Sequence, residues 1–260
     1  MFTFSKEHKD FIKRHKKEKY TIIISQIFII AFFIFLWQLS ADLKLINTFL
    51  FSSPKDIFNT LIKLINNNLL THIRVTTYET IASFLISSIF GIIIATILWL
   101  NKTIAKIIEP YLTVINSLPK VALGPLIIIW VGASTNSIIF MALMISLIIS
   151  IINIYNAFIL TEENYITLLK SLGASKWQIF TKVILPSNKT NIINAFKINI
   201  SMSLIGVIMG ELLVSKEGLG YLIMYGSQVF NINLTITSVV ILGILSYILY
   251  YIINKIEKII

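Results

Sequence analysis

The chain has 260 residues, of which 56% are hydrophobic and only 13% are charged, and its mean hydropathy is +0.85. A soluble domain carries about a quarter of charged residues, so this composition predicts a polytopic membrane protein. The net charge of +10 comes from basic residues in short segments between apolar runs, which membrane topology explains better than nucleic-acid binding. Cysteine is absent, and none of the three histidines lies at ligand spacing from a carboxylate, so we expect neither disulfides nor a metal centre.

Six apolar segments are long enough to cross the hydrocarbon, which takes roughly 20 residues of helix. The predicted spans are Tyr20–Leu39, Thr77–Leu100, Tyr111–Val131, Ser137–Leu160, Ile192–Val214 and Leu234–Ile253. The first run is too long for a signal peptide and lacks a small-residue cleavage site, so we interpret it as a retained helix. The sequence therefore predicts an all-α membrane fold, with a basic N-terminal segment over residues 1–19 and a transmembrane domain over 20–260.

The distribution of basic residues predicts the orientation of these spans. With both termini in the cytoplasm, fifteen Lys and Arg residues lie on the inner side and five on the outer side. The inner residues include Lys255 and Lys258 near the C-terminus. Residues 1–19 are then a solvated segment suited to anionic lipid, and residues 52–70 form an outer interfacial helix.

Polar residues inside the third predicted span indicate a pathway, because such groups are expensive in hydrocarbon. Lys120 lies close to Asn116 and Ser117, and Pro119, Gly124 and Pro125 predict a bent or unwound helix. A cation here would attract an anionic substrate. The sequence leaves open the alternative that Lys120 reaches the interface or pairs with an acidic group.

The cytoplasmic connection over residues 161–191 is far longer than a turn between helices requires. Thr161 is suited to cap a helix that begins with Glu162 and Glu163. We expect Ile166, Leu169 and Leu172 on one face of that helix, which is followed by a bend at Gly173. A second amphipathic turn then carries Trp177, Phe180 and Ile184 and stops at Leu185-Pro186. Spacing alone fits either an interfacial anchor or a docking surface for a cytoplasmic partner.

The fifth predicted span contains a small-xxx-small pair, Gly206 and Gly210, followed by Glu211. The glycines fit close packing within one subunit or a seam against a second copy. Glu211 suits an ion pair with a lysine, or a role in gating the outer mouth of the pathway. Residues 215–233 form an apolar outer segment that suits an interfacial or re-entrant helix.

The chain lacks a phosphate-binding G-x-x-x-x-G-K-[ST] loop and a recognisable Ser/His/Asp or Cys/His set. We therefore expect a non-catalytic membrane subunit that contains no cofactor. An ion-coupled secondary transporter and a membrane-embedded enzyme are the alternatives from other classes. The first usually carries internal repeats and acidic groups within the membrane, and the second needs a catalytic constellation, so neither fits the sequence as well.

Four motifs together resemble the ABC-transporter permeases of the binding-protein-dependent (inner-membrane component) family. The cytoplasmic "LLKSLGASKWQIFTKVILP" is similar to the family's coupling loop, and "FSSPKDIFNTL" to the segment before its second span. "EPYLTVINSLPKVALGPLIIIWVG" and "MGELLVSKEGLGYLI" resemble its third span and the end of its fifth. The resemblance covers residues 51–260 and is nearest to the sulfonate, nitrate and taurine branch.

The resemblance implies a permease subunit of a bacterial ABC importer in the cytoplasmic (inner) membrane. It implies a second permease copy, two ATPase subunits that hold ATP and Mg²⁺, and an extracytoplasmic substrate-binding protein. The substrate would be a small anion such as a sulfonate, taurine or nitrate, and a vitamin precursor is the alternative. One departure is that Thr167-Leu168-Leu169 stands where the family has Glu-Ala-Ala. The residues that match the coupling loop are Glu162, Glu163, Thr167, Leu168, Leu169, Lys170, Gly173, Ala174, Trp177, Leu185 and Pro186.

Overall fold

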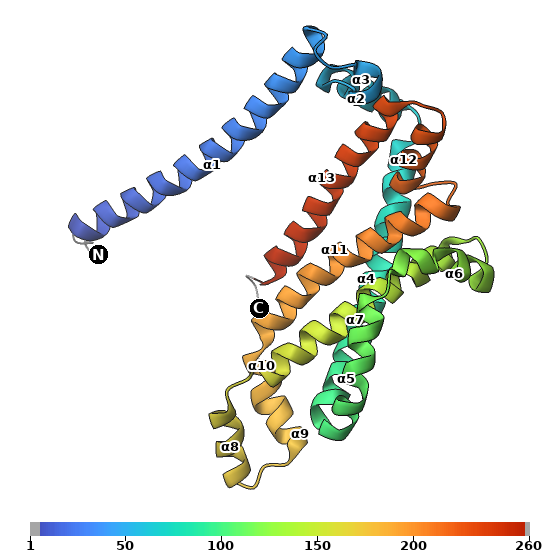
Figure 1. The fold of residues 1–260 in the computed structure, drawn as a ribbon. Coiled ribbons are helices and arrows are strands. Elements are labelled where there is room, and N and C mark those ends of the chain that lie inside the picture. The colour runs from blue at the N-terminus through green and yellow to red at the C-terminus, as the bar shows by residue number, and fades with distance from the viewer. Residues whose placement is uncertain (1–5, 258–260) are drawn as a thin grey trace. The chain divides into compact units, whose positions relative to one another are not determined.

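A computed structural model describes residues 6–257, and all regular elements among them are helices (Figure 1). Met1 to Ser5 and Lys258 to Ile260, which include the start of the basic segment and Lys258, lie outside the described residues. The chain divides into two compact units, Met1–Lys63 and Leu64–Ile260.

The first unit contains the predicted first span. Helix α1 covers Lys6–Asp42 and includes a stretch long and apolar enough to cross a membrane. The basic segment predicted over residues 1–19 therefore belongs, from Lys6 onward, to the same helix as the first span. Helices α2 (Thr48–Phe51) and α3 (Pro54–Asn66) follow. Ser53 Oγ accepts a hydrogen bond from the Asp56 N–H at 3.2 Å, which satisfies a free backbone donor in the first turn of α3. Helix α3 agrees with the helix predicted within residues 52–70.

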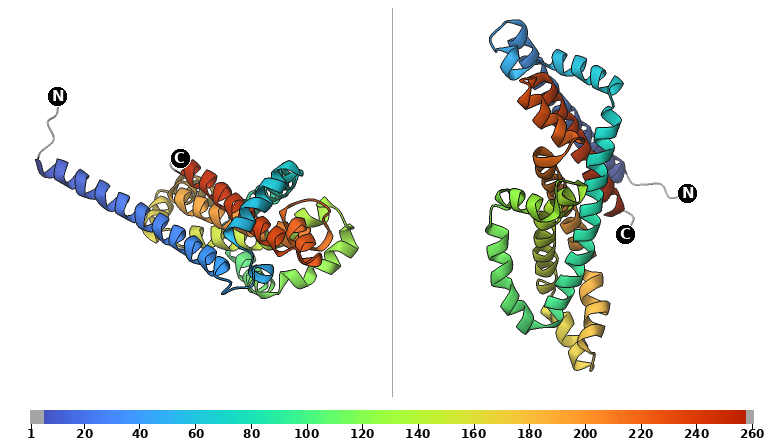
Figure 2. Two further views of the ribbon diagram at one scale, coloured as in Figure 1. Left: turned by 90° about the horizontal axis from the view of Figure 1, so that it is seen from above. Right: turned by 90° about the vertical axis from the view of Figure 1, so that its right-hand side faces the viewer.

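The second unit contains all the later helices (Figures 1 and 2). They are α4 (Leu69–Leu100), α5 (Lys102–Ser117), α6 (Gly124–Val131), α7 (Thr135–Ile159), α8 (Glu163–Ser171), α9 (Lys176–Ile179), α10 (Leu185–Ser187), α11 (Lys189–Val214), α12 (Leu219–Gln228) and α13 (Ile232–Glu257). Among the described residues, five helices are long and apolar enough to span a membrane. The number is six when the bent pair α5 and α6 is taken as one span. This agrees with the six predicted spans.

Helices α4, α7 and α11 pack together through small residues. A methyl group added to Gly91 of α4 would lie 2.3 Å from Ser150 Oγ of α7. One added to Gly206 of α11 would lie 2.4 Å from the Cα of Ala142, also in α7. Small residues let helix backbones approach closely. Dispersion and hydrogen bonds then hold the helices together in a membrane, where the hydrophobic effect does not drive their association.

The pair Gly206 and Gly210 therefore serves packing within the chain. Gly210 faces Ile138 of α7, whose Cα would lie 3.0 Å from an added methyl group. Both glycines are buried, so α7 occupies the face that a second copy would have used. This supports the first of the two sequence interpretations, close packing within one subunit.

Candidate functional site

The cytoplasmic connection forms the two short helices that the sequence predicts, but its first cap differs. Helix α8 begins at Glu163 with Glu162 as its N-cap. Thr161 is not the cap, because its hydroxyl accepts a hydrogen bond from the Asn188 side-chain amide at 2.6 Å. Asn188 is buried and also donates to the Ile184 carbonyl at 2.9 Å. The hydrogen bond between Asn188 and Thr161 therefore joins the two ends of the connection, 27 positions apart.

Gly173 bends the connection as predicted, and its backbone shows why glycine stands there. Its φ is +78°, in the left-handed region, and nothing lies within 4 Å of an added methyl group. The requirement is therefore conformational and not spatial. Ser175 then caps α9 in a reciprocal pair with Gln178, at 2.8 and 3.2 Å, a signal of the S-x-x-Q type that the sequence interpretation missed.

The second amphipathic turn does not stop at Leu185-Pro186. A π-helical turn over Phe180–Ile184 follows α9 and runs directly into α10. Pro186 lies within this helical stretch, directly after the π-helical turn, and has no N–H to donate. The chain thus stays helical, with changes of pitch, from Lys176 to Ser187.

The two faces of α8 have different surroundings, and one residue differs from the prediction. Ile166 and Leu169, with Ala174 after the helix, pack against a buried apolar cluster that includes Phe158 of α7 and Phe180. Leu172 does not join them and is 74% exposed. It lies instead with Tyr165 and Leu168, at spacings of three and four residues, on an outward apolar face. Glu162, Glu163, Thr167 and Lys170 are exposed and polar.

Aromatic packing anchors this segment to the spans. Phe180 is buried and contacts Trp99 of α4 and Phe158 of α7, with ring centroids 5.5 and 5.4 Å apart. Trp177 stacks on Phe180 at 5.7 Å and keeps much of its ring exposed. Leu185 is also exposed. The segment therefore has a rigid attachment and, around Leu168, Leu172 and Trp177, an uncovered apolar surface.

The third predicted span is broken where its prolines and glycine stand. Helix α5 ends at Ser117, a 3₁₀ turn covers Lys120–Leu123, and the segment Lys120–Val131, which contains this turn and α6, is bent by 84° from α5. Asn116 and Ser117 are exposed on α5. The amino group of Lys120 donates to the Asn116 carbonyl at 3.1 Å and to Asn116 Oδ1 at 3.0 Å, and no acidic residue of the described chain lies within ion-pair distance of it.

Glu211 is buried, and its partners are not the lysine that the sequence suggested. One carboxylate oxygen accepts a hydrogen bond from Thr76 Oγ1 of α4, and the other accepts one from the Gly220 N–H of α12, both at 2.6 Å. Thr76 Oγ1 in turn accepts from the Leu219 N–H at 2.8 Å. The outer helix α12 is thus held to α4 and α11 through one carboxylate.

Sequence reasoning missed Glu79, which lies in α4 one turn after Thr76. Its side chain is fully buried in α4, beside Glu211 of α11 and near Thr135 of α7. A single carboxylate within an apolar run was the available signal. It was missed because its significance depends on Glu211, which is far away in the sequence.

Comparisons with known proteins agree with this architecture. Residues 87–260 match the family described as "Binding-protein-dependent transport system inner membrane component". The formylaminopyrimidine transport permease protein ThiX of Halalkalibacterium halodurans is 25% identical over 86% of this chain and 89% of its own length. The taurine transport system permease protein TauC of Escherichia coli is 21% identical over 85% of this chain and 82% of its own.

A solved structure has the same fold. In the MetNI methionine ABC transporter, described in inward-facing conformations, the matching chain superposes with a TM-score of 0.63 at 20% identity, covering 73% of this chain and 96% of that one. The family match covers more than half of the chain and includes the broken span, the connection over residues 161–191 and the Glu211 region. The chain therefore belongs to the family of binding-protein-dependent transport system inner membrane components, as a multi-pass, non-catalytic permease subunit of an ABC transporter.

Proposed function

We propose that helices α8 and α9 are the surface through which this permease receives the movement of its ATPase. The carrying observation is the outward apolar face of α8, where Leu168 and Leu172 are 59% and 74% exposed. An amphipathic helix that is fixed to its own protein on one face offers the other to a groove in a partner. The ATPase moves the segment only if it binds this face differently in its two nucleotide states.

We propose further that two copies of this chain enclose the pathway and that a small anion crosses it. The broken span supports this, because the exposed Asn116 and Ser117 and the half-buried Lys120 lie where irregular backbone is tolerated only beside protein or a water-filled cavity. Lys120 has hydrogen bonds to Asn116 and no carboxylate partner within the described chain. Its charge is therefore available to an anion such as a sulfonate, taurine or nitrate.

Helix α12 is proposed as the outer gate, over which a substrate-binding protein docks. Its attachment through Glu211 and Thr76 to two spans supports this, because movement of α4 relative to α11 would pull on α12. In the proposed cycle, the binding protein delivers substrate at this side, ATP brings the motor subunits together, and the α8 segments carry that movement to the spans.

A vitamin precursor is the second candidate substrate. The observation that favours it is the similarity to ThiX, whose name assigns it to formylaminopyrimidine transport. The two candidates differ in what they require of Lys120. An anion gains from the charge, whereas a pyrimidine without an acidic group does not.

The test is uptake by the complete importer, with its ATPase and binding protein, reconstituted in vesicles. For an anionic substrate, Lys120→Gln should lower uptake at least tenfold while Lys120→Arg keeps most of it. Lys216→Gln, an exposed lysine at the outer end, serves as the control for loss of one positive charge. Equal uptake by the wild type and Lys120→Gln would reject the anion pathway and favour the pyrimidine-type substrate.

A further inference from the structure

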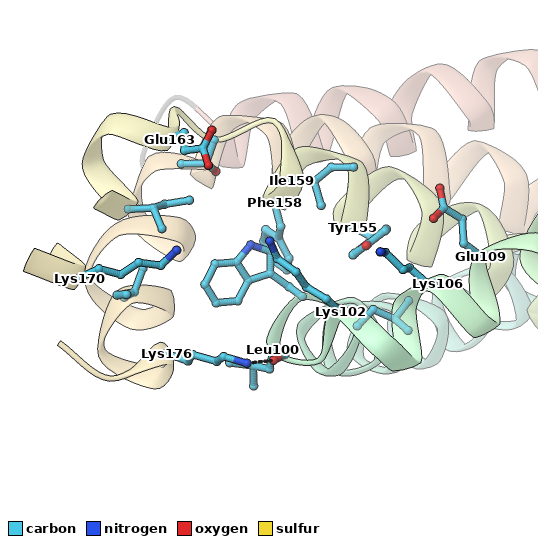
Figure 3. Close-up of a pocket in the computed structure, with 15 residues that line it drawn as sticks. Leu100, Lys102, Lys106, Glu109, Tyr155, Phe158, Ile159, Glu163, Lys170 and Lys176 are labelled. Atoms are coloured by element: carbon cyan, nitrogen blue, oxygen red, sulfur yellow. Dashed lines mark hydrogen bonds between the residues drawn. The ribbon is translucent and has the colours of Figure 1, made fainter. Parts of the chain in front are cut away.

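A pocket of about 430 Å³ lies between α8 and α9, which together we call the coupling segment, and the adjoining ends of α4, α5 and α7 (Figure 3). Its apolar lining includes Trp99, Tyr155, Phe158 and Ile179. Its polar lining consists mainly of four lysines: Lys102 and Lys106 from α5, Lys170 from α8 and Lys176 from α9. We refer to it as the lysine pocket.

The charges in the lysine pocket are not balanced. Glu109 and Glu163 also line it, so four positive groups face two negative ones. None of the four amino groups lies within 4.0 Å of a carboxylate, because the described part of the chain has a single ion pair, Lys197 with Glu257. Lys176 donates to the Leu100 carbonyl at 3.2 Å, which orients its amino group without neutralising it. Cations gathered in this way repel one another, and a bound anion relieves the repulsion.

The position of the pocket indicates which anion. Trp99 and Tyr155 lie near the ends of α4 and α7, as aromatic residues do at a membrane interface. The predicted orientation puts this end in the cytoplasmic leaflet, where anionic lipids are found, and basic pockets between spans on that side bind phospholipid headgroups. A lysine amino group is a compact donor that suits a phosphate oxygen.

We propose that the lysine pocket binds the phosphate group of an anionic phospholipid. Lys102 and Lys106 hold it from α5, and Lys170 and Lys176 hold it from the coupling segment, while the aromatic and aliphatic lining contacts the apolar part of the lipid. Because the two pairs come from different elements, the phosphate links α8 and α9 to α5. The consequence for coupling rests on the proposed function of α8 and α9, whereas the binding itself does not.

The experiment measures lipid binding by the full chain, independently of transport. The chain purified in detergent is titrated with phosphatidylglycerol and, separately, with phosphatidylcholine, and bound lipid is counted by native mass spectrometry. Each lysine removed should weaken phosphatidylglycerol binding about fivefold, so Lys102→Gln/Lys106→Gln should weaken it about 25-fold. The matched control is Lys182→Gln/Lys189→Gln, which removes two exposed lysines outside the pocket, one in the π-helical turn and one at the start of α11, and should change binding less than twofold.

A third titration, with inorganic phosphate, identifies the source of the phosphate group. Retention of phosphatidylglycerol in excess phosphate supports the lipid, and displacement would assign the site to a soluble phosphate and overturn the lipid assignment. Equal weakening in the pocket and control variants would overturn the site, because binding would then follow overall charge. The lipid site would also be overturned if adding the ATPase released all lipid and the pocket variants no longer bound the ATPase. The pocket lysines would then belong to the contact with the ATPase. Both variant pairs should unfold at the wild-type temperature, because all four lysines are exposed.

Discussion

At the scale of single residues, Gly173 and Glu211 each restrict which side chain can stand at their position, for different physical reasons. Gly173 has open space around it and a positive φ, so only its backbone conformation demands glycine. Glu211 is surrounded by donors that depend on its oxygens. A substitution at the first strains the main chain, whereas one at the second leaves buried polar groups without a partner.

Replacing Gly173 with alanine should reduce coupling without affecting membrane insertion. The left-handed conformation costs an alanine about 1–2 kcal/mol, so the bend between α8 and α9 should relax toward other conformations. We expect ATP-driven uptake to fall severalfold, with Gly173→Asn retaining more because asparagine tolerates this conformation better. Gly132→Ala is the control for backbone strain elsewhere in the chain, because Gly132 has a positive φ and open space, in a conformation at least as unfavourable for alanine, and lies in the turn before α7. Equal loss of uptake in both variants would show that strain alone, and not the coupling bend, is responsible.

Glu79 and Glu211 should respond oppositely to replacement by glutamine. Glu211→Gln replaces one of two acceptor oxygens with a donor and should cost about 1–3 kcal/mol of unfolding free energy, since a buried donor loses its partner. Glu79→Gln removes one of two carboxyl groups that lie side by side in the interior and keeps a side chain of the same shape, so stability should be unchanged or higher. Thermal unfolding of both variants in detergent gives the comparison. A lower unfolding temperature for Glu79→Gln than for Glu211→Gln would contradict it.

At the scale of elements, what could be predicted depended on whether the signal was local. The apolar runs, the break at Pro119 and Gly124, and the bend at Gly173 are written in neighbouring residues, and the structure confirms them. The start of α4 at Leu69, eight residues before the predicted Thr77, could not be found in this way. The added residues 69–76 mix polar and apolar side chains, and Thr76 among them is buried against Glu211, 135 residues away. The buried position of Asn199, whose side-chain amide donates to Ser87 and Ser88 of α4, could not be predicted for the same reason.

The packing of α11 on α7 should not accommodate a side chain at Gly206, so Gly206→Ala should destabilise the fold. An added methyl group would lie 2.4 Å from the Ala142 Cα, so the helices must separate, at a cost of about 1–3 kcal/mol. Gly243→Ala is the matched control, because Gly243 lies in the interior of α13 with nothing within 4 Å of an added methyl group. There the better helix propensity of alanine should be neutral or stabilising. The unfolding temperatures of the two variants test this, and equal values would mean that α7 and α11 are not in close contact.

At the scale of the whole molecule, the proposals for coupling and lipid binding both require one orientation in the membrane. Figures 1 and 2 show α8 and α9 at one end of the second unit and α12 at the other, so these two regions should lie on opposite sides of the bilayer. Helix α4 alone has 32 residues and is about 48 Å long, which exceeds the roughly 30 Å of hydrocarbon and carries the chain into both interfaces.

The absence of cysteine makes that orientation directly measurable, because the natural chain has no thiol of its own. Ser171→Cys introduces an exposed thiol at the end of α8, and Lys216→Cys introduces one before α12. A membrane-impermeant maleimide added to intact cells should label Lys216→Cys and leave Ser171→Cys unlabelled until the membrane is opened. The opposite labelling would put α8 outside, away from any ATPase and from the cytoplasmic leaflet. It would reject the coupling segment and the lipid assignment of the lysine pocket together, while labelling as expected leaves each to its own binding test.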